Sequence, residues 1–111
     1  MPIIVYDPNP VPVTYTNEEL KIIVSEFLSN IETEFSFSKL STYVLERALC
    51  EKKVRNAETT QYSNRSLNPR VSIEISRLLW ELIWEKKIFI VFGNNPYIPQ
   101  NSQDIRFMPN K

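Results

Sequence analysis

The chain has 111 residues, no net charge, and a globular balance of 42% hydrophobic and 23% charged residues, which excludes a fully disordered protein. It contains no histidine and a single cysteine, so histidine-based catalysis, an internal disulfide bond and a thiolate zinc cluster are excluded. There is no signal-peptide core and no apolar run of membrane-spanning length, so we expect a cytoplasmic protein without a membrane partner.

The first segment, residues 1–15, is expected to be an extended arm, because it holds four of the eight prolines. Within it, residues 3–6 are either a short edge strand or part of a frayed terminus. Thr16 and Glu19 have the spacing of a capping box, which predicts that a helix begins there. Apolar residues at helical spacing extend this helix over residues 17–32.

A second apolar stripe predicts a helix at about residues 37–53, with Cys50 filling space in the core. Residues 54–67 are polar and have no clear period, which predicts a loop. This loop is long for a compact domain, and long loops are usually functional or disordered.

The last predicted elements are a helix and a hairpin. Asn68 followed by proline predicts the start of a third helix at about residues 69–87. A β-branched and aromatic run at 88–92 predicts a strand, the turn residues at 93–96 follow it, and residues 105–108 are a plausible returning strand.

Three helices followed by a hairpin, with the third helix running directly into a strand over residues 82–92 (LIWEKKIFIVF), resemble the winged-helix superfamily over residues 17–108. The resemblance implies an α+β fold, a three-helix bundle followed by a C-terminal β-hairpin, as a single domain over residues 16–111. In its DNA-binding members the third helix enters the major groove. The polar loop at 54–67 departs from the usual short turn between the second and third helices, so a three-helix α+β domain without a wing is the alternative.

Basic residues gather where such a domain would meet phosphate. Residues 1–46 carry a net charge of −5, whereas residues 47–77 carry seven basic and three acidic side chains, a net charge of +4. This indicates either an electrostatic footprint for double-stranded DNA or an ordinary solvated loop. The candidate nucleic-acid contacts are Lys52, Lys53, Arg55, Arg65, Arg70 and Arg77.

The third predicted helix has a second apolar face, formed by Ile73, Trp80 and Trp84, beside an acidic strip of Glu74, Glu81 and Glu85. Two tryptophans and three glutamates do not suit a major-groove helix. The N-terminal arm either covers this face, through residues such as Tyr6, Val11, Val13 and Tyr15, or the face is exposed and used for dimerisation or a partner.

No arrangement of residues typical of an active site, a metal site or a cofactor site is found, so we predict no catalytic residues, no metal and no cofactor. Two functions stay open. One is a DNA-binding module that acts as a small transcriptional regulator, and the order of the elements favours it. The other is a protein-interaction domain, either a homodimer or a subunit of a larger complex, that uses Ile73, Trp80 and Trp84.

Overall fold

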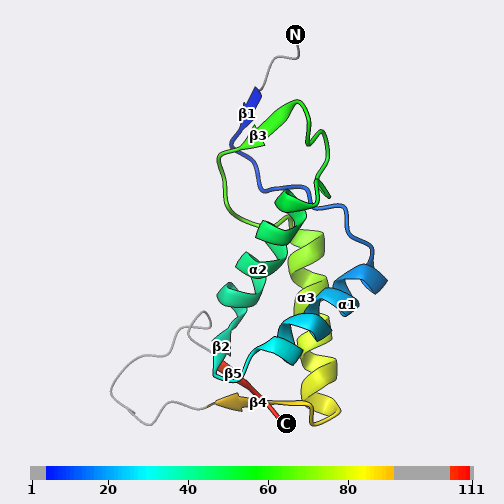
Figure 1. Cartoon of the computed structure of the whole chain (residues 1–111), viewed down its shortest axis with the longest axis vertical. Helices are drawn as coiled ribbons and strands as arrows, with labels where there is room; N and C mark the ends of the chain where they lie inside the picture. The colour runs from blue at the N-terminus through cyan, green and yellow to red at the C-terminus, as the bar shows by residue number, and fades with distance from the viewer. Residues whose placement is uncertain (1–4, 92–105, 111) are drawn as a thin grey trace, which may run out of the picture.

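The computed structural model describes residues 5–91 and 106–110. Within them, three helices stand against a small antiparallel sheet at one end of the molecule, and two short parallel strands lie at the other end (Figure 1). The coarse prediction of an α+β fold with three helices is therefore confirmed. The elements in chain order are β1 (Val5–Asp7), α1 (Asn17–Asn30), β2 (Phe35–Ser36), α2 (Phe37–Cys50), β3 (Thr60–Tyr62), α3 (Pro69–Trp84), β4 (Ile88–Val91) and β5 (Arg106–Pro109).

The antiparallel sheet has the strand order β2-β5-β4, so the strand that comes last in the sequence is the central one. Phe107 on β5 is paired with Phe35 on one side and with Ile90 on the other. Both predicted strands of the C-terminal hairpin are confirmed, and the sheet also recruits β2, which the sequence did not indicate. The predicted turn at 93–96 lies outside the described residues.

The N-terminal arm pairs with the segment predicted to be a loop. Strand β1 runs parallel to β3, which confirms the strand alternative for the described part of the arm and shows that the loop prediction for 54–67 is wrong at β3. Two isolated bridges also join the arm to this segment, a parallel one from Val11 to Leu67 and an antiparallel one from Val13 to Val54. These partners are more than forty residues apart in sequence, so no local period could signal them.

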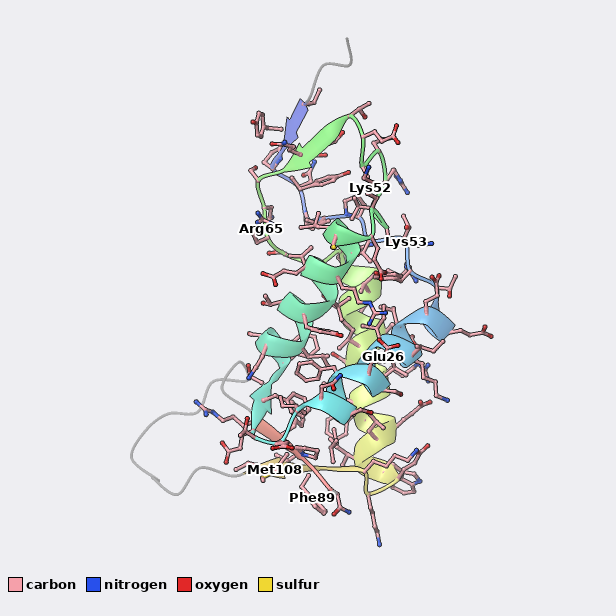
Figure 2. All side chains as sticks on the ribbon, viewed as in Figure 1. Glu26, Lys52, Lys53, Arg65, Phe89 and Met108 are labelled. Carbon is pink, nitrogen blue, oxygen red and sulfur yellow. The ribbon has the colours of Figure 1, made fainter. Side chains whose placement is uncertain are left out.

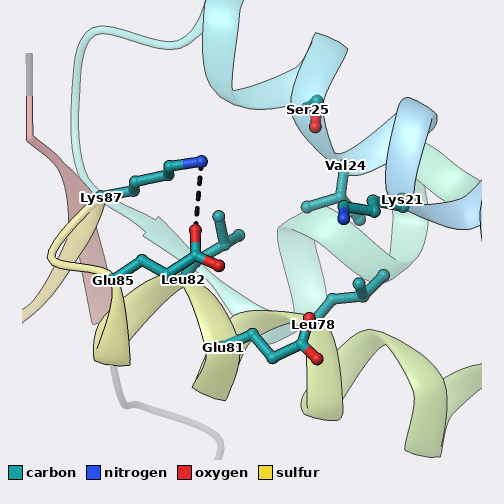
Figure 3. Close-up of a pocket in the computed structure, with 8 residues that line it drawn as sticks. All are labelled: Lys21, Val24, Ser25, Leu78, Glu81, Leu82, Glu85 and Lys87. Atoms are coloured by element: carbon teal, nitrogen blue, oxygen red, sulfur yellow. Dashed lines mark ion pairs between the residues drawn. The ribbon is translucent and has the colours of Figure 1, made fainter.

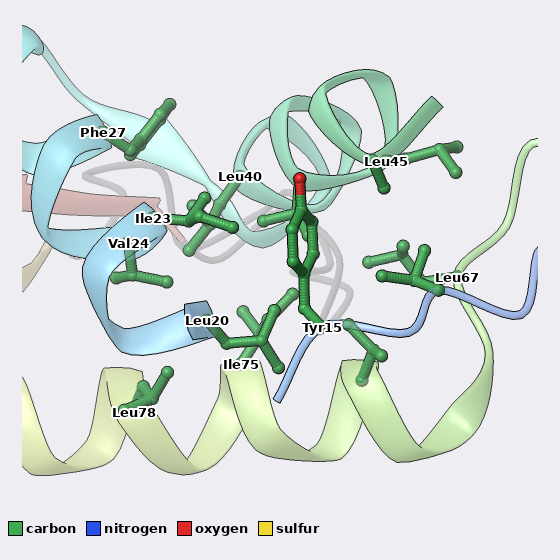
Figure 4. Close-up of a cluster of buried hydrophobic side chains, with 14 of the residues drawn as sticks. Tyr15, Leu20, Ile23, Val24, Phe27, Leu40, Leu45, Leu67, Ile75 and Leu78 are labelled. Atoms are coloured by element: carbon green, nitrogen blue, oxygen red, sulfur yellow. The ribbon is translucent and has the colours of Figure 1, made fainter. Parts of the chain in front are cut away.

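The core lies where the apolar faces of the three helices meet. Leu20 on α1, Leu40 on α2 and Ile75 on α3 are fully buried there. The arm completes this core, because Val11 and Tyr15 are also buried, and Figure 4 shows the Tyr15 ring standing among the side chains of all three helices. Each helix thus buries the stripe that its sequence periodicity predicts.

Aromatic rings join the helices to the sheet. Phe27 on α1 meets Phe35 on β2 edge to face, with ring centroids 5.2 Å apart and an interplanar angle of 80°. The ring centroid of Tyr43 lies 5.2 Å from that of Phe27, and the ring centroid of Phe107 lies 5.6 Å from that of Phe35. Offset and edge-to-face contacts of this kind are favourable beyond the area they bury, and here they fix the sheet against α1 and α2.

Helix α1 begins as predicted. Thr16 Oγ1 accepts a hydrogen bond from the amide of Glu19 at 3.2 Å, and Glu19 Oε1 accepts one from the amide of Thr16 at 3.0 Å, which confirms the capping box. The helix ends at Asn30, two residues before the predicted end, because Ile31 has an extended backbone.

Helices α2 and α3 both end three residues sooner than predicted, and for the same reason. Lys52 and Lys86 have left-handed backbones, with φ of 58° and 62°, which stops each helix. The amides of the following residues, Lys53 and Lys87, donate back to carbonyls of the last helical turn at 2.8 and 2.9 Å. This is a Schellman motif, in which glycine usually occupies the left-handed position. Lysine takes that position in both helices.

Two local predictions have different outcomes. Cys50 is exposed, so its predicted place in the core is wrong; it follows the exposed Glu46 by one turn of α2 and shares its solvent side. Asn68 does precede α3, with Pro69 in the first turn, but its side chain makes no capping hydrogen bond.

Candidate interaction surfaces

The exposed basic residues of the predicted nucleic-acid surface lie around the end of α2 and the segment after it. Figure 2 shows Lys52 and Lys53 on one side of this end of the molecule and Arg65 on the other. Lys53 Nζ lies 3.9 Å from Glu19 Oε2. Lys52, Arg55 and Arg65 form no ion pair with any described residue. Three cations are therefore available to an external anion, but they do not form one continuous patch.

Hydrogen bonds to the arm and within the segment itself hold this basic segment in place. The amide of Arg55 donates to the carbonyl of Pro12 at 3.2 Å, and the Tyr62 hydroxyl donates to the carbonyl of Arg55 at 2.5 Å. Arg70 is itself part of this anchoring, since its Nη2 donates to the carbonyl of Tyr15 at 2.6 Å. Among the six predicted contacts, Arg70 is thus already engaged with the arm.

Arg77 is engaged as well, in ion pairs along α3. Its Nε donates to both carboxylate oxygens of Glu74, at 3.0 and 3.1 Å, and its Nη1 donates to Glu81. These hydrogen bonds raise the pKa of Arg77 and lower that of Glu74. Glu74 is only 7% exposed, so its predicted place in an exposed acidic strip is wrong, whereas Glu81 and Glu85 are exposed. The Glu74 side chain is buried beside the core because Val71 and Leu78, each about one turn away, are buried on its side of the helix.

A second network of hydrogen bonds connects α1, α2 and the arm. The Tyr15 hydroxyl donates to Glu51, and Arg47 donates to Glu51 and to Glu26. Burial of the ring, followed by the hydrogen bond to Glu51, raises the pKa of Tyr15. The same hydrogen bond is the main cause that lowers the pKa of Glu51. Arg47 therefore serves the fold and is not available as a further basic contact.

The outer face of α3 is the most apolar exposed surface of a described helix. Ile73 is 69% exposed, Trp80 is 65% exposed and Trp84 is 88% exposed. Together with Arg77 they form the α3 face, and they lie within about 60° of the helix circumference at 100° per residue. Tryptophans this exposed do not stabilise the core of the monomer. Exposure of large apolar side chains to water is unfavourable, so their position on the surface needs another explanation.

The N-terminal arm does not cover the α3 face, so that alternative is wrong. Val11, Val13 and Tyr15 are buried in the main core, on the other side of α3, and Tyr6 is itself exposed in β1. The remaining alternative, an exposed apolar face, is the arrangement that the structure has.

The outer surface of the antiparallel sheet has a smaller apolar pair that sequence reasoning missed. Phe89 on β4 and Met108 on β5 are register partners and both are exposed (Figure 2). Their neighbours in sequence, Ile88 and Phe107, are buried. The signal was present in the alternation of a strand, whose successive side chains point to opposite faces.

A cavity of about 100 Å³ lies between α1 and the C-terminal half of α3 (Figure 3). Its wall carries mixed charges, including the ion pair of 3.1 Å between Lys87 Nζ and Glu85 Oε2. Pockets that hold small organic ligands usually measure about 300–1,000 Å³, so this cavity does not suit such a ligand.

The described residues include no group of three or more cysteine or carboxylate side chains that could hold a metal ion. Among the same residues, no helix is both long enough and apolar enough to cross a bilayer. Comparisons with family models, with curated proteins and with solved structures give no match for this chain. Its function is therefore inferred from its own residues.

Proposed function

We propose that this chain is a non-enzymatic protein-interaction module whose α3 face, formed by Ile73, Arg77, Trp80 and Trp84, docks another protein chain. The observation that carries the proposal is the exposure of the two tryptophans, 65% and 88%, on one side of a well-packed helix. Tryptophan and arginine are the residues most enriched among interface hot spots, and this face holds both. A neutral overall charge fits a protein partner better than a polyanion.

We propose further that the fold is a winged-helix arrangement. The order of the elements, with β2 between α1 and α2 and the β4–β5 hairpin after α3, supports it. So does the strand order β2-β5-β4, in which the short strand before α2 joins the hairpin through β5. The β1–β3 pair is then an addition to that arrangement, made from the arm and the long connection between α2 and α3.

The docking proposal is tested with a photo-reactive amino acid, p-benzoyl-phenylalanine, placed at single positions of the full chain. The variants are expressed in cells of the organism that produces this protein. Position 73 probes the α3 face. Position 22 is a matched control, because Ile22 is also an isoleucine on a helix and is 57% exposed. The expected result is a cross-linked protein of discrete mass from position 73 and none from position 22. Failure of position 73 to cross-link, or equal labelling from both positions, would contradict the docking role.

A second candidate function, DNA binding, is favoured by one specific observation: Lys52, Arg55 and Arg65 are exposed and form no ion pair with a described residue. They would contact phosphate beside the first turn of α3 rather than bases, since the outer face of α3 is apolar. In a DNA complex the slope of log K against log salt is negative, and each lost phosphate contact reduces its magnitude by about 0.9.

Anisotropy of a labelled random duplex, titrated at low and near-physiological salt, tests this second candidate. The decisive variants are Lys52→Ala and Lys86→Ala, because both lysines occupy the left-handed position after a helix and only Lys52 lies in the basic segment. Lys52→Ala should flatten the salt slope and Lys86→Ala should leave it unchanged. Absence of binding at low salt, or an equal effect of both variants, would remove DNA from the list of partners.

A further inference from the structure

We infer that the occupant of the α3 face is a second copy of this chain, which pairs its own α3 with the first in antiparallel orientation. This inference rests on the docking role proposed above and names the partner for it. Two copies related by a twofold axis present the same patch to each other, so the patch has to be complementary to itself. The spacing, the charges and the size of the α3 face each meet that requirement.

The spacing of the face is the same in both directions along the helix. From Ile73 the steps to Arg77, Trp80 and Trp84 are four, three and four residues, and from Trp84 backwards they are again four, three and four. An antiparallel partner therefore places Ile73 against Trp84 and Arg77 against Trp80, twice each. Alternating steps of three and four are those of helices that pack side by side at a small angle.

The charges also match in this orientation. Arg77 would lie over the indole of the partner's Trp80, where a guanidinium is attracted to the face of the ring. Glu81 follows Trp80 directly, so its carboxylate in the second copy would lie close to the same guanidinium. The chain as a whole has no net charge, so two copies approach without long-range repulsion.

The area is enough for a dimer of modest affinity. A buried tryptophan removes up to about 250 Å² from water, so the exposed parts of Trp80 and Trp84 contribute about 400 Å² per copy. A stable interface buries about 800 Å² per partner. Ile73 on the face is 69% exposed. Arg77 on the face and Glu81 beside it are each about half exposed. These three side chains supply much of the remaining area.

Sedimentation equilibrium of the purified full chain tests the inference. We expect a mass of about twice 13.1 kDa at about 100 µM protein, which suits an interface of this size. Ile73→Glu should give a monomer, since losing a hot-spot residue on both copies raises Kd about a thousandfold. Ile22→Glu, the matched control on α1, should remain dimeric. Because both isoleucines are exposed, both variants should keep the wild-type circular dichroism spectrum; if Ile73→Glu unfolds, Trp84→Lys replaces it and should likewise be monomeric.

Two outcomes would overturn the inference. One is a wild-type chain that stays monomeric at every concentration. The other is a dimer that Ile73→Glu and Trp84→Lys leave intact. A monomeric chain that still cross-links from position 73 to a protein of another mass would keep the docking role and reject the second copy. A chain that does neither rejects both.

The antiparallel orientation has its own test, in a Cys50→Ser background that removes the exposed native thiol. Under mild oxidation, a mixture of Ile73→Cys and Trp84→Cys chains should form a disulfide-linked dimer, and each variant alone should not. Cross-linking of the Ile73→Cys chain with itself would indicate parallel helices and contradict the geometry. Each mixed pair keeps one native Ile73–Trp84 contact, and the disulfide traps even a weakened dimer covalently, so absence of any cross-link in the mixture would contradict it too.

Discussion

Replacing Tyr15 with phenylalanine removes one hydroxyl group and leaves the buried ring in place. In the native chain this hydroxyl donates to Glu51, and the ring is 2% exposed. A hydrogen bond to an ionised carboxylate contributes about 1.5–3 kcal/mol, and the lower value applies here because Glu51 is half exposed. Tyr15→Phe should therefore lower the free energy of unfolding by about 1.5 kcal/mol at pH 7. Because no other group changes, the decrease in the free energy of unfolding measures the hydrogen bond that connects the arm to the end of α2.

The same substitution should have the opposite effect at high pH. Burial and the hydrogen bond to Glu51 raise the pKa of Tyr15 above its ordinary value near 10. Above pH 10 the unfolded chain loses this proton and the folded chain keeps it, so the free energy of unfolding of the native chain falls. For one proton the fall is about 1.4 kcal/mol per pH unit. The Tyr15→Phe chain lacks this loss, so the two stability curves should cross at about pH 11.

Urea unfolding at a series of pH values measures both effects. Far-ultraviolet circular dichroism is the suitable signal, because Trp80 and Trp84 are already exposed in the folded chain and their fluorescence reports unfolding weakly. All other ionisable groups are the same in both proteins, so their contributions cancel in the difference. Equal stability at pH 7, or curves that stay parallel from pH 10 to pH 11.5, would refute the role given to the Tyr15 hydroxyl.

Three further predictions concern stability. Lys52→Gly and Lys86→Gly should each raise the free energy of unfolding by about 0.5–1 kcal/mol, measured by thermal melting, because glycine adopts a left-handed backbone without strain; a lower melting temperature would contradict this. The pKa of Glu74 is lowered by its hydrogen bonds from Arg77, so its stabilising effect is present above its ordinary pKa and is lost as pH falls below it. Glu74→Gln should therefore show a shallower loss of stability between pH 5 and pH 2 than the native chain, and an unchanged acid profile would argue against the pair. Ile75→Ala, at a fully buried position, should cost about 2–5 kcal/mol in urea unfolding, and a cost below 1 kcal/mol would mean that α3 is not packed as described.

Local signals in the sequence predicted what depends on neighbouring residues. The capping box of Thr16 and Glu19 placed the start of α1, and helical periodicity placed all three helices. The helix ends were predicted less well, because lysine gives no warning that Lys52 and Lys86 will adopt the left-handed backbone that glycine usually takes. Cys50 was misplaced for a related reason, since a helix face is defined least well in its last turn.

Features that depend on distant partners were not predictable in the same way. The pairing of β1 with β3 joins segments about fifty-five residues apart, and neither has an alternating pattern of its own. For the candidate site, the sequence identified Ile73, Trp80 and Trp84 as a second face but left open whether the arm covered it. The hydrogen bond from Arg70 to the carbonyl of Tyr15 was equally unpredictable, because a helical wheel shows which side of the helix a residue lies on but not what it contacts.

The position of the arm in the core has a consequence for how the chain folds as it is synthesised. Val11 and Val13 bridge to Leu67 and Val54, so the arm has no partner until those residues have left the ribosome. At about 5–20 residues per second, the interval between Val13 and Leu67 lasts about 3–10 s. During this interval, three arm residues that are buried in the folded protein, Val11, Val13 and Tyr15, have no complete core to pack into. Pairing of the arm with residues 54–67 then closes the β1–β3 end of the molecule, which lies opposite the antiparallel sheet (Figure 1).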